Sequence, residues 1–231
     1  MKIIERPSPS FNERVGAGVP DILIMHYTGM QSCAAAVERL TDPASRVSSH
    51  YTVDEDGTIY RHVAEEMRAW HAGVSHWRGA TDINSRSIGI EIVNPGHEFG
   101  YRAFPDVQME AVIQLSKSIV SRHAIPARNV IGHSDIAPAR KTDPGELFPW
   151  QALAEAGLGI WVKLRAIGKI QPLMRGMSGP DVSRLQGQLI NYGYGLELTK
   201  AYDEQTEVVV SAFQRHFRPA NFDGVADAET Q

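Results

Sequence analysis

The chain has 231 residues and a net charge of −4, and it is long enough for one large domain or two modest ones. Its 42% hydrophobic and 22% charged residues are typical of a soluble folded protein, and the lack of a basic excess argues against nucleic acid as a partner. No apolar run in the sequence reaches membrane-spanning length, and the single cysteine, Cys33, excludes an internal disulfide or a cysteine-based zinc cage.

Strand and helix patterns alternate through the first two thirds of the chain. Residues 1–20 are rich in Pro, Ser, Asn and Gly and predict an irregular leader. Strands are expected at 21–27, 50–53, 58–62, 87–93 and 129–131, with a hairpin turn at Asp56-Gly57. Helices are expected at 31–41, at 105–123 and, shorter, near Pro149. This mixture predicts an α/β fold in which helices flank a central mixed sheet.

The apolar residues of the 105–123 segment predict which face of that helix is buried. We expect a broad stripe formed by Val107, Ala111, Ile113, Leu115, Ile119 and Val120.

The sequence pattern changes after about residue 160. We expect a first domain at 1–159, a connector at 160–172 and a small helical domain at 173–231. In the last, a helix through Leu185 and Leu189, capped by Ser178 or Asp181, should end at Gly193-Tyr194-Gly195. A second helix should run from Asp203 to about Phe217.

One loop, residues 132–145, combines residue types that carry chemistry. His133, Lys141 and Asp143 follow a short buried strand, and prolines and glycines keep this segment from being a helix. His26 ends a similar apolar run. His26, His133 and Asp143 could supply the three protein ligands of a catalytic zinc site, with a fourth position left for water.

Spacing alone does not decide this question, because no local motif joins the two histidines. Both could be structural histidines, and His50, His71 and His123 compete as ligands. His123 sits near a helix C-terminus, a position typical of a helix-end group.

Glu91 interrupts an otherwise apolar strand, Ser87 to Asn94. Ile88, Ile90 and Ile92 share one face, so Gly89 and Glu91 share the other. A carboxylate there is costly unless it is paired or used. The alternative is an edge strand with a polar face, but we favour a functional role for Glu91.

Five ordered motifs carry a resemblance over roughly residues 20–157. They are Met25-His26-Tyr27-Thr28, Val47-Ser48-Ser49-His50-Tyr51, Arg68-Ala69-Trp70-His71-Ala72-Gly73, Ser87-Ile88-Gly89-Ile90-Glu91 and Gly132-His133-Ser134-Asp135-Ile136-Ala137-Pro138. In order and content the chain resembles the zinc-dependent N-acetylmuramoyl-L-alanine amidases of type 2, which include phage lysozyme-type amidases and peptidoglycan recognition proteins.

The resemblance implies a role for each candidate residue. His26, His133 and Asp143 would bind Zn2+, Glu91 would be the general acid/base, and Lys141 would stabilise the oxyanion. Trp70, His71 and His50 would line the substrate site, although His50 and Tyr51 could instead pack beneath it. The motifs around Trp70 and Lys141 are most similar to the subgroup that accepts anhydromuramyl peptides. The bond implied is the amide between N-acetylmuramic acid and L-alanine of the peptidoglycan stem peptide.

The C-terminal segment resembles the type 1 peptidoglycan-binding domain, a three-helix module. The shared features are Gly176 to Val182, Leu185-Gln186, Gly193-Tyr194, Asp203, Thr206 and Phe213-Gln214. The sequence departs from the pattern at 228–231, where the last helix would begin, so we expect a shortened or truncated module. A packing role without sugar binding is the alternative.

Two other functions stay open at this point. One is a non-catalytic peptidoglycan recognition module, which would hold no stoichiometric zinc. The other is a zinc peptidase that cleaves within the stem peptide. The partner expected is peptidoglycan or a muropeptide in each case, and the oligomeric state cannot be read from the sequence. The N-terminus lacks the apolar core of a secretory signal, which predicts a cytoplasmic protein; the wall-binding-like tail favours the periplasm or envelope.

Overall fold

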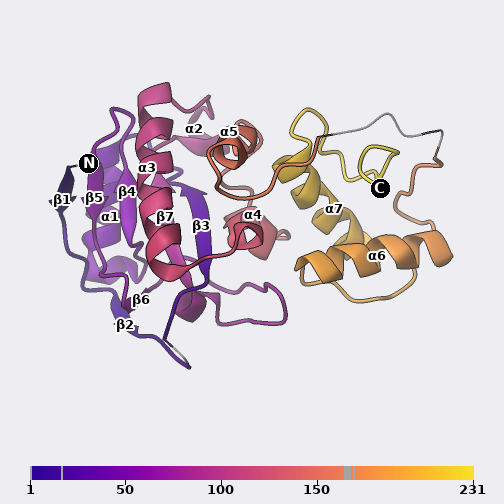
Figure 1. The fold of residues 1–231 in the computed structure, drawn as a ribbon, viewed down its shortest axis with the longest axis horizontal. Helices are drawn as coiled ribbons and strands as arrows, with labels where there is room; N and C mark the ends of the chain where they lie inside the picture. Colours follow the sequence, from indigo (N-terminus) through magenta and orange to yellow (C-terminus); the bar gives the residue numbers. More distant parts are fainter. Residues whose placement is uncertain (1, 17, 164–167, 169) are drawn as a thin grey trace.

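The computed structural model describes residues 2–16, 18–163, 168 and 170–231. Six strands form its main sheet, in the order β1-β5-β4-β7-β3-β8 (Figure 1). Their bounds are β1 (Ile3–Glu5), β3 (Ile22–Tyr27), β4 (Tyr51–Val53), β5 (Ile59–Arg61), β7 (Ser87–Ile92) and β8 (Val130–Gly132). A second, antiparallel pair joins β2 (Phe11–Glu13) to β6 (Met67–Ala69).

The centre of the sheet is parallel. Strands β4, β7, β3 and β8 run in one direction, whereas β5 is antiparallel to β4 across the turn at Asp56-Gly57. This confirms the predicted mixed sheet, and it has a consequence for function. The carboxyl ends of four neighbouring strands meet at one edge, where residues from distant parts of the sequence come together.

Helices cover both faces of the sheet. On one face α3 (Asp106–His123) packs against alternate residues of the central strands, including Leu23, Met25, Ile88 and Ile90. On the other face lie α1 (Cys33–Thr41) and the loops that form the candidate site (Figure 1). The shorter helical segments of this part are α2 (Gly96–Phe99), α4 (His133–Ile136), α5 (Trp150–Glu155) and 3-10 turns at 43–45, 83–86 and 127–129.

The buried face of α3 differs from the predicted stripe. Val107 is 51% exposed, while Met109 and Val112 are buried together with the polar Gln108 and Ser116. Gln108 is buried because its side-chain amide donates to the carbonyl oxygens of Val53 and Val93 at the ends of two strands. A hydrogen-bonded glutamine thus occupies a position that apolar periodicity assigns to solvent.

Two further expectations near the N-terminus and the site were wrong. Residues 1–20 are not an irregular leader, because Ile3–Glu5 pairs with β5 and Phe11–Glu13 pairs with β6. The loop at 132–145 does contain one helical turn, α4, which Asp135 stabilises by accepting a hydrogen bond from the backbone N–H of Gly132 (2.8 Å). The prolines follow that turn and so do not prevent it.

The C-terminal helices are α6 (Pro180–Tyr192) and α7 (Glu204–Phe217). Asp203 caps α7 through the N–H of Thr206, but neither Ser178 nor Asp181 caps α6, which begins after Gly179. Part of the predicted connector, residues 164–167 and 169, lies outside the described residues.

The C-terminal helices pack directly on the sheet domain. Asp135 of α4, 1% exposed, accepts hydrogen bonds from Tyr194 Oη (2.6 Å) and from His216 Nδ1 (2.8 Å). The ring of Trp150 stacks on that of His216, with the two ring centroids 3.8 Å apart, and Trp77 contacts Tyr194 edge to face. One buried apolar cluster therefore runs through both parts of the chain.

A buried carboxylate, Glu65, ties α3 to the strands and gives a stability prediction. It accepts hydrogen bonds from Tyr51 Oη (2.7 Å), His123 Nε2 (2.6 Å) and Arg122 Nε (3.1 Å). Burial alone would raise the pKa of Glu65, but these three partners lower it to about 2. Because this pKa is depressed, the stabilisation is complete above the ordinary value of 4.5 and is lost as the pH falls towards 2.

We expect Glu65→Gln to lower the free energy of unfolding by about 2 kcal/mol at pH 7. Urea denaturation at pH 7, 5 and 3 measures it, with the exposed neighbour Glu66→Gln as control. The difference from the wild type should shrink between pH 5 and pH 3. A difference that is the same at all three pH values would contradict the assignment.

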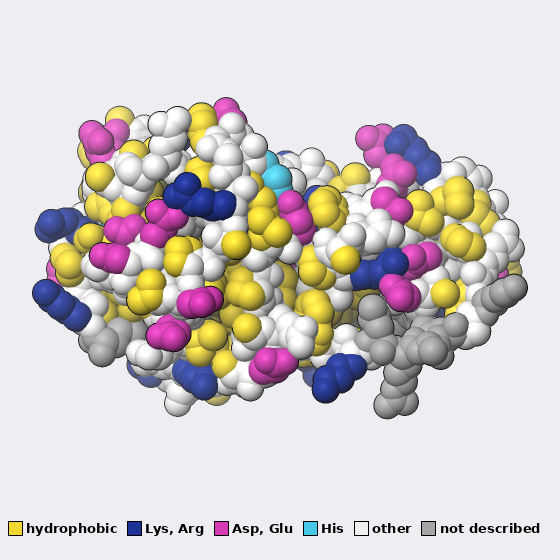
Figure 2. All heavy atoms as spheres, turned by 90° about the horizontal axis from the view of Figure 1, so that it is seen from above, with side chains coloured by type: hydrophobic (Ala, Val, Ile, Leu, Met, Phe, Trp, Pro, Cys, Tyr) yellow, Lys and Arg dark blue, Asp and Glu magenta, His cyan; other side chains and the backbone are white. Residues whose placement is uncertain are grey.

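Among the described residues, no helix combines the length and apolar character needed to cross a bilayer. On the face drawn in Figure 2, Lys and Arg are dispersed among Asp and Glu and do not gather in one patch.

Candidate metal centre and active site

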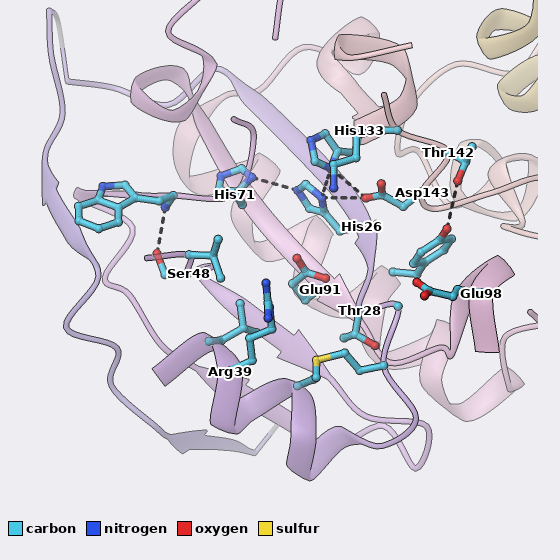
Figure 3. Close-up of a pocket in the computed structure, with 18 of the residues that line it drawn as sticks. His26, Thr28, Arg39, Ser48, His71, Glu91, Glu98, His133, Thr142 and Asp143 are labelled. Carbon is cyan, nitrogen blue, oxygen red and sulfur yellow. Dashed lines mark hydrogen bonds and ion pairs between the residues drawn. The ribbon is translucent and has the colours of Figure 1, made fainter. Parts of the chain in front are cut away.

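Three side chains meet at the carboxyl edge of the parallel strands (Figure 3). His26 lies near the end of β3, and His133 directly follows β8, the neighbouring strand. The loop after α4 returns Asp143 to the same point, where its backbone carbonyl accepts from the N–H of Ser134 (2.9 Å). All three residues are buried. The topology therefore joins groups that are far apart in the sequence.

The three potential ligand atoms form a triangle with sides of 3.0 Å. The Nδ1 atoms of His26 and His133 are 3.0 Å apart, and each lies 3.0 Å from Oδ2 of Asp143. A tetrahedral metal with bonds of about 2.0–2.1 Å separates its ligands by about 3.3 Å. The triangle is therefore close to the size that one metal ion requires.

The hydrogen bond made by His133 favours the same conclusion. Its Nε2 lies 3.0 Å from the carbonyl oxygen of Ala72, which can only accept. Nε2 therefore carries the proton, and the lone pair of Nδ1 faces Asp143. A lone pair turned towards a buried carboxylate is unfavourable unless a cation lies between them. Two imidazoles and one carboxylate in this arrangement fit a divalent cation.

Burial and the neighbouring groups shift the pKa values of His26 and Asp143. Burial lowers the pKa of His26 to about 4, and the neighbouring His133 adds to the effect. Burial also opposes ionisation of Asp143, but the two histidines outweigh it and hold the pKa of Asp143 below its ordinary value. At neutral pH a neutral His26 and an ionised Asp143 result, which are the forms that bind metals.

Glu91 stands beside the cluster. The β3–β7 register pairs His26 with Glu91, so both side chains leave the same face of the sheet (Figure 3). Its Oε2 is buried and has no hydrogen-bond partner within the described part of the chain. Burial and the charge of Asp143 raise the pKa of Glu91 to about 8, and Lys141 opposes the rise. Such a group can take up and return a proton near neutral pH.

A cavity of about 620 Å³ opens over this cluster. Lys141, Trp70 and His71 line it, as do His26, Glu91 and Asp143. Arg39 reaches it from α1 (Figure 3). Seven of the eight predicted site residues thus share one cavity. His123 lies elsewhere, bonded to Glu65 at the end of α3, as its position predicted.

His50 is the exception and corrects the sequence-based assignment. It is 0% exposed and does not line the cavity. Its Nδ1 accepts from the backbone N–H of Gly89 (3.0 Å), and its Nε2 lies 3.1 Å from the carbonyl oxygen of Met67. His50 therefore joins β4 to β7 beneath the site, and no atom of it is free to contact a substrate.

Other residues at the site were missed by the sequence analysis. Arg140 donates to the carbonyl oxygens of Ala72 (2.6 Å) and Val74 (2.7 Å), which joins the 137–145 loop to the 72–74 loop. Asn84 accepts from the backbone N–H groups of His71 (3.1 Å) and Ala72 (2.8 Å). No local pattern marks either side chain, because each acts on backbone groups that are distant in the sequence.

Comparison with known proteins agrees with this geometry. Residues 16–146 match the N-acetylmuramoyl-L-alanine amidase family, and residues 178–231 match a peptidoglycan binding domain. Over 222 residues the chain is 40% identical to the N-acetylmuramoyl-L-alanine amidase AmiD of Escherichia coli, covering 91% of this chain and 79% of the relative. The chain belongs to the N-acetylmuramoyl-L-alanine amidase family.

Solved structures of family members extend the likeness to the whole fold. The chain matches AmiD from E. coli in complex with anhydro-N-acetylmuramic acid-L-Ala-D-γ-Glu-L-Lys, with a TM-score of 0.77 and 36% identity over 96% of this chain and 94% of the other. It also matches AmpDh3 from Pseudomonas aeruginosa in complex with anhydromuramic pentapeptide, with a TM-score of 0.74 and 34% identity over 91% and 88%. The likeness confirms the predicted fold class and includes the C-terminal helices.

Proposed function

We propose that the protein is a zinc-dependent amidase that cleaves the bond between N-acetylmuramic acid, or its 1,6-anhydro form, and L-alanine of the stem peptide. The observation that carries the proposal is the triangle of His26, His133 and Asp143, open to a cavity that also holds Glu91. Imidazole nitrogen and carboxylate oxygen are ligands that zinc prefers. The two solved relatives bound to anhydromuramyl peptides support the substrate class.

His26, His133 and Asp143 would hold the zinc. When bound, zinc supplies Lewis-acid chemistry, polarising an amide carbonyl and making water more acidic. Glu91 would take the proton of the attacking water and pass it to the leaving nitrogen of L-alanine. Lys141, on the same cavity wall, would stabilise the negative charge that develops on the carbonyl oxygen.

The remaining assignments follow from position. Trp70 and His71 line the cavity and would contact the sugar or peptide. Residues 1–159 would form the catalytic domain, and residues 173–231 would hold peptidoglycan near it, with 160–172 as the connector. A role in the recycling or remodelling of the cell wall follows from this substrate. The cytoplasmic location expected from the sequence stays a prediction.

Two alternative functions can be distinguished from amidase activity by experiment. A recognition module would bind muropeptides without zinc, and a zinc peptidase would cleave between amino acids of the stem. The unpartnered carboxylate of Glu91 favours an enzyme over a recognition module, because a binding protein has no need to bury it. The products formed from a muropeptide distinguish the amidase from the peptidase.

Digestion of a purified anhydromuropeptide, followed by mass spectrometry, tests the proposal. Zinc-loaded protein should release the intact stem peptide and the free anhydromuramyl sugar. Protein treated with a chelator should release neither, and added zinc should restore both products. Shortened peptides still attached to the sugar would establish the peptidase instead. Intact muropeptide that co-elutes with wild-type protein even after zinc has been supplied would establish the recognition module.

A further inference from the structure

His71 forms more than a wall of the cavity, because both of its ring nitrogens have partners. Its Nδ1 lies 3.0 Å from Nε2 of His26, a contact drawn in Figure 3. Its Nε2 lies 3.2 Å from the hydroxyl oxygen of Ser87 at the start of β7. The ring therefore bridges a candidate metal ligand and the sheet beneath it.

The partners assign each proton in this chain of contacts. The hydroxyl of Ser87 donates its one proton to the carbonyl oxygen of Ile83 (2.8 Å), which can only accept. The oxygen of Ser87 must then accept from His71, so Nε2 of His71 carries the proton and its Nδ1 bears a lone pair. That lone pair accepts from Nε2–H of His26, and Nδ1 of His26 is left with its lone pair facing the metal position.

The backbone holds the His71 ring in place from two sides. A β-carbon at Gly89 would lie 2.5 Å from Nδ1 of His71, so only glycine at that position leaves room for the ring. Asn84 fixes the backbone of His71 and of Ala72, as described above. Ala72 in turn supplies the carbonyl that orients His133. One short segment thus orients both imidazole ligands.

We infer that His71 is a positioning residue that fixes the tautomer of His26. Ser87 and the carbonyl of Ile83 in turn fix the tautomer of His71. This inference rests on the proposed metal site and goes beyond it by giving His71 a role other than substrate contact. Removing a hydrogen bond that orients a metal ligand typically lowers metal affinity by about 10- to 100-fold.

The first test reads the tautomers in the metal-free wild-type protein by long-range 1H–15N correlation of the histidine rings. His26, His71 and His133 should all carry their proton on Nε2. A proton on Nδ1 of His71 or His26 would overturn the inference. Because no metal is present, this result is independent of whether the proposed function holds.

The second test compares His71→Leu with His71→Asn, two side chains of nearly the same shape. Only asparagine places an acceptor where Nδ1 of His71 lies. Zinc affinity, measured by competition with a chromophoric chelator, should fall about 10- to 100-fold in His71→Leu and by much less in His71→Asn. Equal zinc affinities in the two variants would overturn the inference, because two side chains of the same size would then fill the space equally well. Failure of the wild type to bind zinc would instead overturn the proposed function.

Ser87→Ala provides a milder third variant in case neither substitution of His71 folds. It removes the acceptor for Nε2–H of His71 and leaves both rings in place. Zinc affinity should fall about fivefold, the value of one ordinary hydrogen bond. Exposed Ser121→Ala on α3 is the control and should bind zinc as the wild type does. No difference between Ser87→Ala and this control would overturn the part assigned to Ser87.

Discussion

Glu91→Gln is expected to lower kcat/KM for muropeptide hydrolysis by about 100- to 10,000-fold, with one zinc per chain retained. Glutamine keeps the size of the side chain but cannot accept the proton of water at neutral pH. Glu91 is not among the three groups of the metal triangle, so zinc binding should be unchanged. Hydrolysis of a purified anhydromuropeptide by the zinc-loaded variant, followed by chromatography, measures the effect.

The same substitution should have an opposite effect on stability. Because the pKa of Glu91 is raised to about 8, the folded metal-free protein keeps this group protonated where the unfolded chain ionises it. That cost is absent below the ordinary value of 4.5 and grows as the pH rises towards 8. Metal-free Glu91→Gln should therefore be more stable than the wild type at pH 8 and equally stable at pH 4.

Glu110→Gln, an exposed carboxylate on α3, is the matched control for both measurements and should change neither. Full activity of zinc-loaded Glu91→Gln would remove Glu91 from the mechanism. Low activity accompanied by lost zinc would instead show that Glu91 supports the metal site. A catalytic carboxyl that lowers stability is common at active sites, where an unpaired buried group is retained for its chemistry.

That the side chains of the site lie close together was predictable in part from the sequence. His26 and His133 each end or follow an apolar run, and parallel strands place such positions at one edge of a sheet. The alternation of Ile88, Ile90 and Ile92 placed Glu91 on the opposite face, as the structure confirms. The residue types in the 132–145 loop already offered Asp143 as a third ligand, and the resemblance to a family favoured this set over the competing histidines.

Other features depended on tertiary contacts that no local pattern encodes. His50 directly precedes β4 and His71 lies two residues after β6, yet only His71 reaches the cavity, because the N–H of Gly89 engages His50. Gln108 is buried on α3 for a similar reason, since it bonds to two carbonyl groups from distant strands. In each case a hydrogen bond to a distant backbone group reversed the expected exposure.

The docking of the C-terminal helices was also not predicted, and it carries the second large effect. Asp135 is two residues from His133, yet its side chain faces away from the cavity and bonds to the N–H of Gly132, to Tyr194 and to His216. It therefore joins the loop that carries the candidate ligands to α7 and to the segment after α6. One buried carboxylate thus contacts both parts of the chain, beside the apolar contacts that also join them.

Asp135→Ala is expected to lower the free energy of unfolding by about 3–5 kcal/mol, because three buried donors lose their acceptor together. Urea denaturation followed by tryptophan fluorescence measures this loss, since Trp77 and Trp150 both contact the C-terminal helices. Tyr194→Phe, which removes one of the three donors, is the comparison and should cost about 1 kcal/mol.

Equal losses in the two variants would show that Asp135 contributes no more than one ordinary hydrogen bond. A loss near 4 kcal/mol, together with weaker zinc binding, would show that docking of the C-terminal helices also supports the metal loop. That second result follows from the geometry, because the carboxylate that Tyr194 and His216 hold also fixes the N–H of Gly132, the residue before His133. The C-terminal helices would then contribute to catalysis through the position of a ligand as well as through any contact with the wall.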